Sequence, residues 1–463
     1  MRPEDLRDRL TDALRASRAG YAEVRVERTR ATRVSFRGPR LEGANESVDA
    51  GGCVRALVDG HGWGVASFTS LDDLPAMLAA AEEMSRAIHL ETPIRLAPAA
   101  PRDDVVIPEV DGDPRDVPLA EKRRLLAHLN GVMLAVSPKI ADTSAAYFDN
   151  RTEWAFANTE GAWLFEVRPE IGLSAHATAR DGDTIERALE SLGLRRGWAG
   201  VQDQERMFRG AAERALALLT APSVQGGTYP VVLDPRLAGV FVHEAFGHLS
   251  EADFVYENPE AREMMTLGRR FGSDLVNIGD DGAAAGLRGT LPYDDEGTPT
   301  QRTRLVDHGI LVGRLHSRET AAAMGEQPTG NARAIDFRHP PIVRMTNTYI
   351  EGGTGTFEDL IRDIPLGVYA VDAIGGQTYL ENFSFSAAHG HMIREGRLAE
   401  LVKDVVLAGN LFHTLQAIDG LAADFRFNQM GGGCGKGGQS PLPVTEGAPH
   451  VRFRELLVGG EVA

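Results

Sequence analysis

The chain has 463 residues and a formal net charge of −17, with 43% hydrophobic and 25% charged residues. This composition is typical of a folded globular protein, and the length predicts two or three domains, because a domain usually contains on the order of 100–200 residues. The acidic balance argues against a nucleic-acid-binding function, because an acidic surface repels phosphate groups.

The two cysteines, Cys53 and Cys434, lie in different settings, one in a strand-like run and one in a glycine cluster. A disulfide framework is therefore not expected, and a reducing compartment fits this usage. The N-terminal stretch is an amphipathic pattern with acidic residues throughout, which is not a signal peptide. No apolar stretch approaches the ~20 residues that cross a membrane. These features predict a cytoplasmic protein with no membrane segment.

The first ninety residues predict a helix, antiparallel strands and a second helix. Pro3 opens a helix with an apolar face that includes Leu6, Leu10 and Leu14. Alternating side chains then predict a strand at 22–27. A hairpin follows, formed by runs at 54–58 and 65–68 around the turn at 59–62, and residues 71–88 are an alanine-rich helix.

Six prolines lie within residues 91–118, and this density predicts an extended connection, since proline continues neither a helix nor a central strand. Helices are predicted at 119–136 and 202–220, with strands between them and turns at 158–161 and 181–183.

A loop at 222–227 marks the predicted domain boundary. The fold class is α+β: a helix and antiparallel-sheet domain over residues 1–222, then a β-rich domain over 223–463 with one metal-binding helix. After residue 228 we expect helices only at 235–250 and, briefly, near 404–415.

The motif that carries chemistry runs from His243 through Glu244 to His248. It follows a strand and the start signal Asp234-Pro235, so both histidines are expected on a helix. Two imidazoles with a neighbouring carboxylate are typical of a metal-dependent hydrolase, with the carboxylate as general base.

The spacing of the two histidines is unusual, because residues five apart on an ideal α-helix point about 140° away from each other. A π-turn near Ala245–Gly247 would bring them together, and Gly247 makes such a distortion easier. The alternative interpretation is that the two histidines are unrelated, one in the core and one on the surface.

A zinc site needs a third protein ligand, and the sequence offers several. Cys434 lies between glycines, which allow the backbone to approach a metal, and nearby Lys436 would favour the thiolate. Glu251 and Asp253 lie just downstream of the histidines. His389 and His391 are a further pair, since they face the same side of a strand.

Four runs of residues resemble the TldD/PmbA metallopeptidases, in that family's order, and the likeness extends over nearly the whole chain. The runs are His243–His248, Gly330–Arg333, Arg344–Ile350 and Cys434–Ser440. This resemblance implies zinc bound by His243, His248 and Cys434, with Glu244 as the base. It also implies a catalytic subunit that cleaves short or unfolded peptides in an enclosed cavity, with maturation or degradation of a modified peptide as its role.

The resemblance further implies a dimer, formed either by two copies or with a metal-free paralogue. We expect His389, His391 and Asn347 to contact the substrate. The peptide would add as a strand to a sheet edge, which gives little sequence preference. Two other functions remain open at this point: a metal-dependent hydrolase of non-peptide amides, and a non-catalytic regulatory subunit, against which the retained Glu244 argues.

Overall fold

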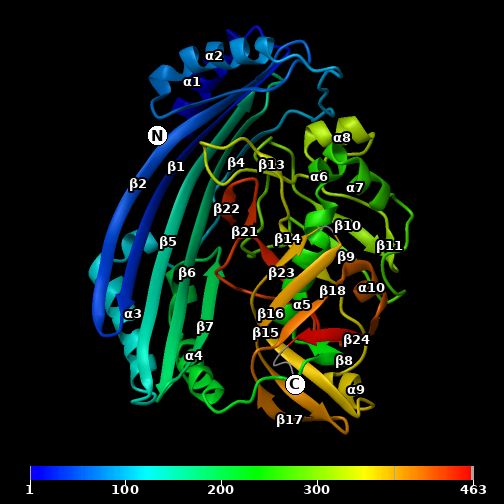
Figure 1. The fold of residues 1–463 in the computed structure, drawn as a ribbon. Coiled ribbons are helices and arrows are strands. Elements are labelled where there is room, and N and C mark those ends of the chain that lie inside the picture. The colour runs from blue at the N-terminus through cyan, green and yellow to red at the C-terminus, as the bar shows by residue number, and fades with distance from the viewer. Residues whose placement is uncertain (1, 380, 460–463) are drawn as a thin grey trace.

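The computed structural model describes residues 2–379 and 381–459. Figure 1 shows the long strands of the first half as one curved layer, with the elements of the second half packed beside it. The mixed α+β architecture with a β-rich second half confirms the predicted fold class. None of the helices in the described part of the chain has the length and apolarity needed to cross a membrane.

The curved layer is a seven-stranded sheet with antiparallel pairing, except that its edge strand β4 runs parallel to β6. β7 (Thr184–Leu194) also pairs with β6. From one edge of the sheet to the other, the strand order is β3 (Gly64–Phe68), β2 (Arg40–Leu57), β1 (Tyr21–Arg37), β5 (Ile140–Asn158), β6 (Trp163–Asp181) and β4 (Asp103–Val106). The predicted hairpin is present, because β2 pairs with β3 in the register Val54↔Ala66.

Four helices pack their apolar faces against this sheet. The three leucines predicted for the first helix are all buried in α1. The predicted helices at 71–88, 119–136 and 202–220 are confirmed, each slightly shorter than expected because its ends form turns or 3-10 segments. The helices are α1 (Pro3–Arg15), α2 (Leu74–Ala87), α3 (Leu119–Leu134) and α4 (Glu205–Leu218).

The proline-rich connection at 91–118 is mostly extended, as predicted, but it also contributes the short edge strand β4 and the 3-10 turn Pro114–Asp116. β4 itself contains no proline, and Pro114 opens the 3-10 turn, where the first N–H groups need no partner within the helix.

The second half contains a ring of strands that closes on itself, because β15 pairs with both β8 and β16. β17 (Arg397–Val402) and β19 (Ile418–Leu421) extend it. The ring is β15 (Leu366–Tyr379), β8 (Gly227–Leu233), β24 (Val451–Gly459), β18 (Val406–Asn410) and β16 (Asn382–Arg394).

A six-stranded sheet lies beside the ring, with two short hairpins. The sheet order is β11 (Ile310–Leu311), β10 (Arg302–Asp307), β9 (Ile278–Asp281), β14 (Asn347–Ile350), β23 (Thr445–Ala448) and β20 (Arg426–Phe427). The hairpins are β12 (Ala332–Arg333) with β13 (Ile342–Val343), and β21 (Cys434–Lys436) with β22 (Gln439–Leu442).

The second half has more helices than the sequence predicted. The helix expected near 404–415 is partly a strand, because β18 occupies Val406–Asn410 and α10 (Leu411–Gln416) begins after it. Four further helices were missed because each has only five to seven residues, too few to show a helical period. They are α6 (Ala252–Glu257), α7 (Pro259–Met264), α8 (Arg318–Met324) and α9 (Phe357–Ile361).

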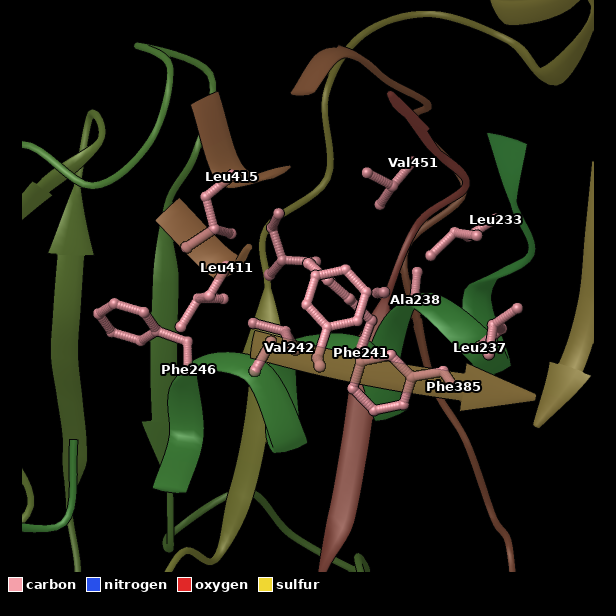
Figure 2. Packing of buried hydrophobic residues seen from close by; sticks show 14 of the residues in the cluster. Leu233, Leu237, Ala238, Phe241, Val242, Phe246, Phe385, Leu411, Leu415 and Val451 are labelled. Carbon is pink, nitrogen blue, oxygen red and sulfur yellow. The ribbon is translucent and has the colours of Figure 1, made fainter. Parts of the chain in front are cut away.

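Helix α5 (Pro235–Val242) passes through the largest apolar core of the chain. Figure 2 shows Phe241 and Phe385 near the centre of this core, with Leu233 and Val451 to the right and Phe246, Leu411 and Leu415 to the left. The Phe241 ring contacts Phe385 edge to face at 6.0 Å between centroids. Full burial of a side chain of this size contributes about 1.5–3 kcal/mol. The helix that carries the histidine motif is therefore held rigidly.

The polar face of β1 is buried rather than exposed, because it is turned toward the second half of the chain. The Glu23 and Arg25 side chains on this face are 4% and 3% exposed. Arg55 of β2 bridges the two halves, since it lies 2.6 Å from Glu23 and 2.8 Å from Glu296. The alternation of residues in β1 thus produces two buried faces. The apolar face packs against the helices, and the charged face forms ion pairs toward the second half of the chain.

We expect Arg55→Met to lower the free energy of unfolding by about 3 kcal/mol, because it leaves two buried carboxylates without their cation. Urea denaturation measures this change. Adding Glu23→Gln and Glu296→Gln to Arg55→Met should recover at least half of the loss.

The matched control is Arg37→Met, which removes an arginine from a solvent-exposed pair with Asp142. Its effect should stay below about 1 kcal/mol. Equal effects of the two substitutions would show that the Arg55 bridge contributes nothing specific.

Candidate metal centre

The helix that carries the histidines begins and ends as the sequence signals indicate. Asp234 accepts a hydrogen bond from the Leu237 N–H at 2.9 Å, and Pro235 occupies the first helical position. After Val242 the helix changes to a π-turn over His243–Gly247, closed by the His248 N–H donating to the His243 carbonyl. The predicted π-turn is confirmed, and it brings both histidines to one side of the helix.

Gly247 is needed for a reason that the sequence did not reveal. Its backbone is ordinary helix, with φ −55° and ψ −52°. A Cβ at this position would lie 2.0 Å from the Sδ atom of Met345. The glycine therefore allows the π-turn to pack against Met345, rather than supplying conformational freedom.

Three donor atoms meet on the inner side of the π-turn. The ligating atoms of His243, His248 and Cys434 all lie within 4.8 Å of one another. Cys434 Sγ is 3.3 Å from His248 Nε2, and the two imidazole rings are 5.3 Å apart and almost perpendicular. Two imidazoles and a thiolate are a donor set that suits zinc in a catalytic site, with one position left for substrate or water.

The protonation states of the three residues support metal binding. Burial alone would raise the pKa of Cys434, but His243 and His248 lower it to about 5, so the residue is a thiolate at neutral pH. Burial lowers the pKa of His243, yet the opposed charge of Cys434 raises it to about 9. The three groups thus form a buried cluster in which each ring attracts the thiolate, and a bound cation would replace the ring protons.

Glu251 and Asp253, which the sequence offered as alternative ligands, lie behind the cluster. Glu251 is 1% exposed and its Oε2 lies 3.1 Å from His248 Nδ1. Lys436 Nζ lies 3.1 Å from Glu251 and 2.6 Å from Asp253. Glu251 therefore orients His248 from the side away from the cluster, as partners of metal-bound histidines do. Lys436 pairs with these two acids, and the groups that lower the pKa of the Cys434 thiol are His243 and His248.

Two arginines hold the hairpin that carries Cys434. Arg344 donates to the Cys434 carbonyl at 2.8 Å and to the Gln439 carbonyl at 3.2 Å. Arg333 donates to the Pro443 carbonyl at 2.7 Å. The runs that contain these arginines thus position the cysteine from the backbone side, although they are distant from it in sequence.

Glu244 stands at the mouth of the cluster and is 28% exposed, with Oε2 3.8 Å from His248 Nε2. Burial raises the pKa of its carboxylate above the ordinary value. A carboxylate that is partly desolvated and open to a pocket is a better proton acceptor than one in bulk water.

A cavity of about 140 Å³ lies in front of the cluster. Its walls include Glu244, Ile374 of β15 and Glu446 of β23. Sequence reasoning missed Glu446, whose Oε1 lies 3.8 Å from the Nδ1 of His243, a nitrogen without a hydrogen-bond partner. The available signal was that Glu446 is the only acidic residue in the segment 437–450.

The three residues expected to contact substrate are not in this cavity. Asn347 is fully buried, and its amide donates to the Asp281 carbonyl at 2.6 Å and accepts from Gly289 at 3.1 Å, so its described contacts are all within the chain. His389 and His391 lie on β16 opposite Val371 and Tyr369. Burial and the nearby Arg214 lower the pKa of His389 to about 4, which keeps it neutral. The alternative that this pair supplies the third metal ligand is also not supported.

Comparison with known families matches three consecutive models along the chain. The PmbA/TldA metallopeptidase C-terminal domain matches residues 226–460, domain 1 of the same family matches 22–88, and its central domain matches 112–219.

Individual relatives agree with these matches. The chain is 45% identical to a metalloprotease of Synechocystis over 96% of each chain. It is 29% identical to a zinc metalloprotease TldD homolog of Saccharolobus solfataricus, over 96% of this chain and 97% of the relative. TldE of Thermococcus kodakarensis has a similar fold, with a TM-score of 0.76 and 17% identity, covering 98% of this chain and 100% of that one.

Cys434→Ser should lose most of the bound zinc, because a serine hydroxyl is not deprotonated at neutral pH and is a weak zinc ligand. Zinc content per chain, measured by mass spectrometry after dialysis, tests this. Glu251→Gln should keep the metal but bind it about 10–100-fold more weakly, because it no longer orients His248 as a carboxylate does.

Cys53→Ser is the matched control, since Cys53 is the other buried free cysteine of the chain. It should retain full zinc content. Full retention by Cys434→Ser would contradict the assignment of Cys434 as a ligand.

Proposed function

The chain belongs to the TldD/PmbA metallopeptidase family, and we propose that it is a zinc-dependent peptidase that hydrolyses short or unfolded peptides. In this proposal His243, His248 and Cys434 hold the zinc and Glu244 is the general base. The observation that carries the proposal is the convergence of three donor atoms beside a half-buried carboxylate at a cavity.

A zinc ion bound there would act as a Lewis acid toward a substrate carbonyl and would make a water molecule more acidic. The chain's own residues would do the rest. Glu244 accepts the proton of the attacking water on a carboxylate oxygen and then delivers it to the leaving amine nitrogen. Glu251 fixes the ring of His248 through Nδ1.

The backbone of β15 offers a place for the peptide. Ala373, Ile374 and Gly375 line the cavity, and β8 pairs with β15 only at Val368–Ala370. Beyond Ala370 this edge of β15 has no partner strand among the described residues, and Ile374 is 68% exposed. An extended peptide could hydrogen-bond along this edge, which supports a preference for unfolded substrates with little sequence selectivity.

Glu244→Gln should bind zinc and peptide as the wild type does, yet cleave a disordered test peptide at least ~100-fold more slowly, because glutamine cannot accept the proton. Paired measurements of zinc content and cleavage rate separate these effects. Loss of zinc would make Glu244 a ligand, and a wild-type rate would place the chemistry elsewhere. Cleavage of small non-peptide amides but of no peptide would favour the alternative hydrolase function.

We further propose that the protein works as a dimer that encloses the cavity, either with a second copy or with a metal-free paralogue. The long outer edge of β2 supports an assembly, since β3 covers it only at Gly52–Ala56 and Val48 is 60% exposed. An uncovered edge of this length is a ready site for association.

Light scattering at micromolar concentration should give a mass near twice 50.0 kDa, or that mass only after the paralogue is added. A monomer with full activity would contradict the proposed dimer.

A further inference from the structure

A second cavity, of about 300 Å³, lies between the curved sheet and the second half of the chain. The sheet contributes side chains from β1, β2, β5 and β6, and Arg195 after β7. The second half contributes Asp295, Arg333 and the segment Pro441–Pro443. This cavity is distinct from the one in front of the metal cluster, and the proposed function does not use it.

Three arginines of this cavity, Arg33, Arg195 and Arg333, have no carboxylate partner within the described ranges. Arg33 is exposed, whereas Arg195 is half-buried and Arg333 is buried. Arg195 donates through Nε to the Arg288 carbonyl at 2.9 Å. Arg333 is 2% exposed, donates to the Met345 and Pro443 carbonyls, and leaves its Nε without a partner. Burial, together with nearby arginines, lowers the pKa of Arg333 to about 9 and that of Arg195 to about 10. Both therefore stay charged at neutral pH, at a cost in desolvation.

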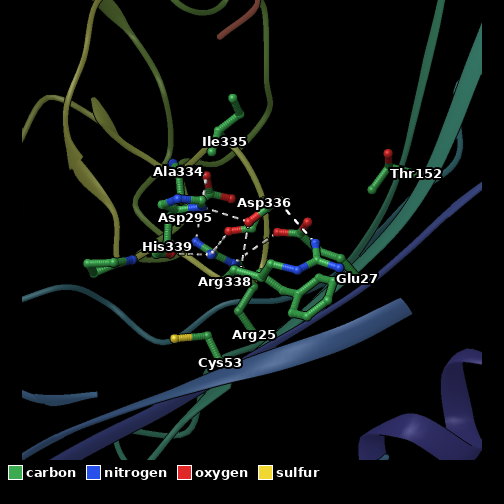
Figure 3. A network of polar contacts seen from close by, with 12 residues as sticks. Arg25, Glu27, Cys53, Thr152, Asp295, Ala334, Ile335, Asp336, Arg338 and His339 are labelled. Carbon is green, nitrogen blue, oxygen red and sulfur yellow. Dashed lines mark hydrogen bonds and ion pairs between the residues drawn. The ribbon is translucent and has the colours of Figure 1, made fainter. Parts of the chain in front are cut away.

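The carboxylates in the same walls already have cations of their own. Figure 3 shows Arg25 between Glu27 and Asp295, and the Arg25–Glu27 distance is 3.0 Å. Asp295 also lies 3.0 Å from Arg168, and Glu170 pairs with Arg288. The two remaining wall carboxylates, Asp49 and Asp336, both pair with Arg338. Each wall carboxylate thus already lies within ion-pair distance of another cation, and neither Arg195 nor Arg333 has a carboxylate of its own. Buried charges are normally paired, so this arrangement points to an anionic ligand.

The second cavity lies next to the metal centre. Leu442 lines the second cavity and is the register partner of Cys434 in the β21–β22 hairpin. Pro443 lines the same cavity, while the next residue, Val444, lines the cavity at the metal cluster. Partner residues of an antiparallel pair are about 5 Å apart. A peptide with its scissile bond at the metal would therefore need only a short further stretch to reach Arg333, which donates to the Pro443 carbonyl.

We propose that this second cavity binds a carboxylate of the peptide substrate, with Arg195 and Arg333 as its recognition residues. The carboxylate would be the free C-terminus of the peptide or the side chain of an aspartate or glutamate. This inference rests on the proposed function, since it names the substrate class of a peptidase. A guanidinium binds a carboxylate through two parallel N–H donors, which suits recognition in a confined space.

The test is a binding measurement that needs no turnover, made on zinc-loaded, full-length Glu244→Gln protein by fluorescence anisotropy. Two pairs of labelled peptides are compared: a free C-terminal acid with its carboxamide, and an internal glutamate with glutamine. The acid should bind about 10-fold or more tightly than its neutral counterpart in at least one pair, because charged hydrogen bonds are stronger than neutral ones. Which pair responds identifies the source of the carboxylate.

Arg195→Met should bring that affinity ratio close to 1, and Arg195→Lys should restore part of it, because lysine keeps the charge. Arg195 is the better site for substitution, since Arg333 also holds the Pro443 carbonyl. The matched control is Arg196→Met, an exposed neighbour outside the cavity, which should keep the wild-type ratio.

Ratios near 1 for both peptide pairs, or an unchanged ratio in Arg195→Met, would overturn the inference. Because affinity is measured without cleavage, these outcomes are separate from a failure of the peptidase proposal, which the cleavage rate of wild-type protein reports.

Discussion

The candidate metal centre depends on one distortion of the helix, the π-turn between His243 and His248. Without the wider turn the two imidazoles would point about 140° apart, and no single ion could touch both. The turn is held from several directions. Phe241 anchors the preceding helix in the core, Met345 packs against the bare backbone of Gly247, and Glu251 fixes the far side of the His248 ring. Each of these contacts supports geometry that local helix propensity alone would oppose.

The second requirement is that a cysteine 186 residues beyond His248 arrives at the same point. The hairpin that carries Cys434 is too short to hold itself, and buried arginines hold it instead. The guanidinium groups of Arg344 and Arg333 donate hydrogen bonds to backbone carbonyls of this hairpin and of the segment that follows. Buried guanidinium groups are costly, yet their planar donors fix backbone position in a way that an apolar contact does not. Because Arg333 holds this segment, its guanidinium charge also lies at the wall of the second cavity.

Local patterns in the sequence predicted the features that neighbouring residues determine. The histidine motif, its π-turn, the Asp234 cap and the helices of the first half all follow from spacing and periodicity. The pairing of β15 with β8, the buried polar face of β1 and the role of Lys436 do not, because each depends on residues brought together from far apart. Asn347 is a further example, because the sequence showed the run of residues that contains it but did not predict that its side chain is buried. Glu446 was missed because a single acid in a four-residue strand carries no periodic pattern.

In the proposed metal centre, one zinc ion is bound by two imidazoles and one thiolate on the inner side of the π-turn. X-ray absorption at the zinc edge of the purified protein measures this ligand set directly. We expect about two nitrogen donors at roughly 2.0–2.1 Å, one sulfur at roughly 2.3 Å and one further light atom. A spectrum in which oxygen and nitrogen are the only donors to zinc would contradict this ligand set.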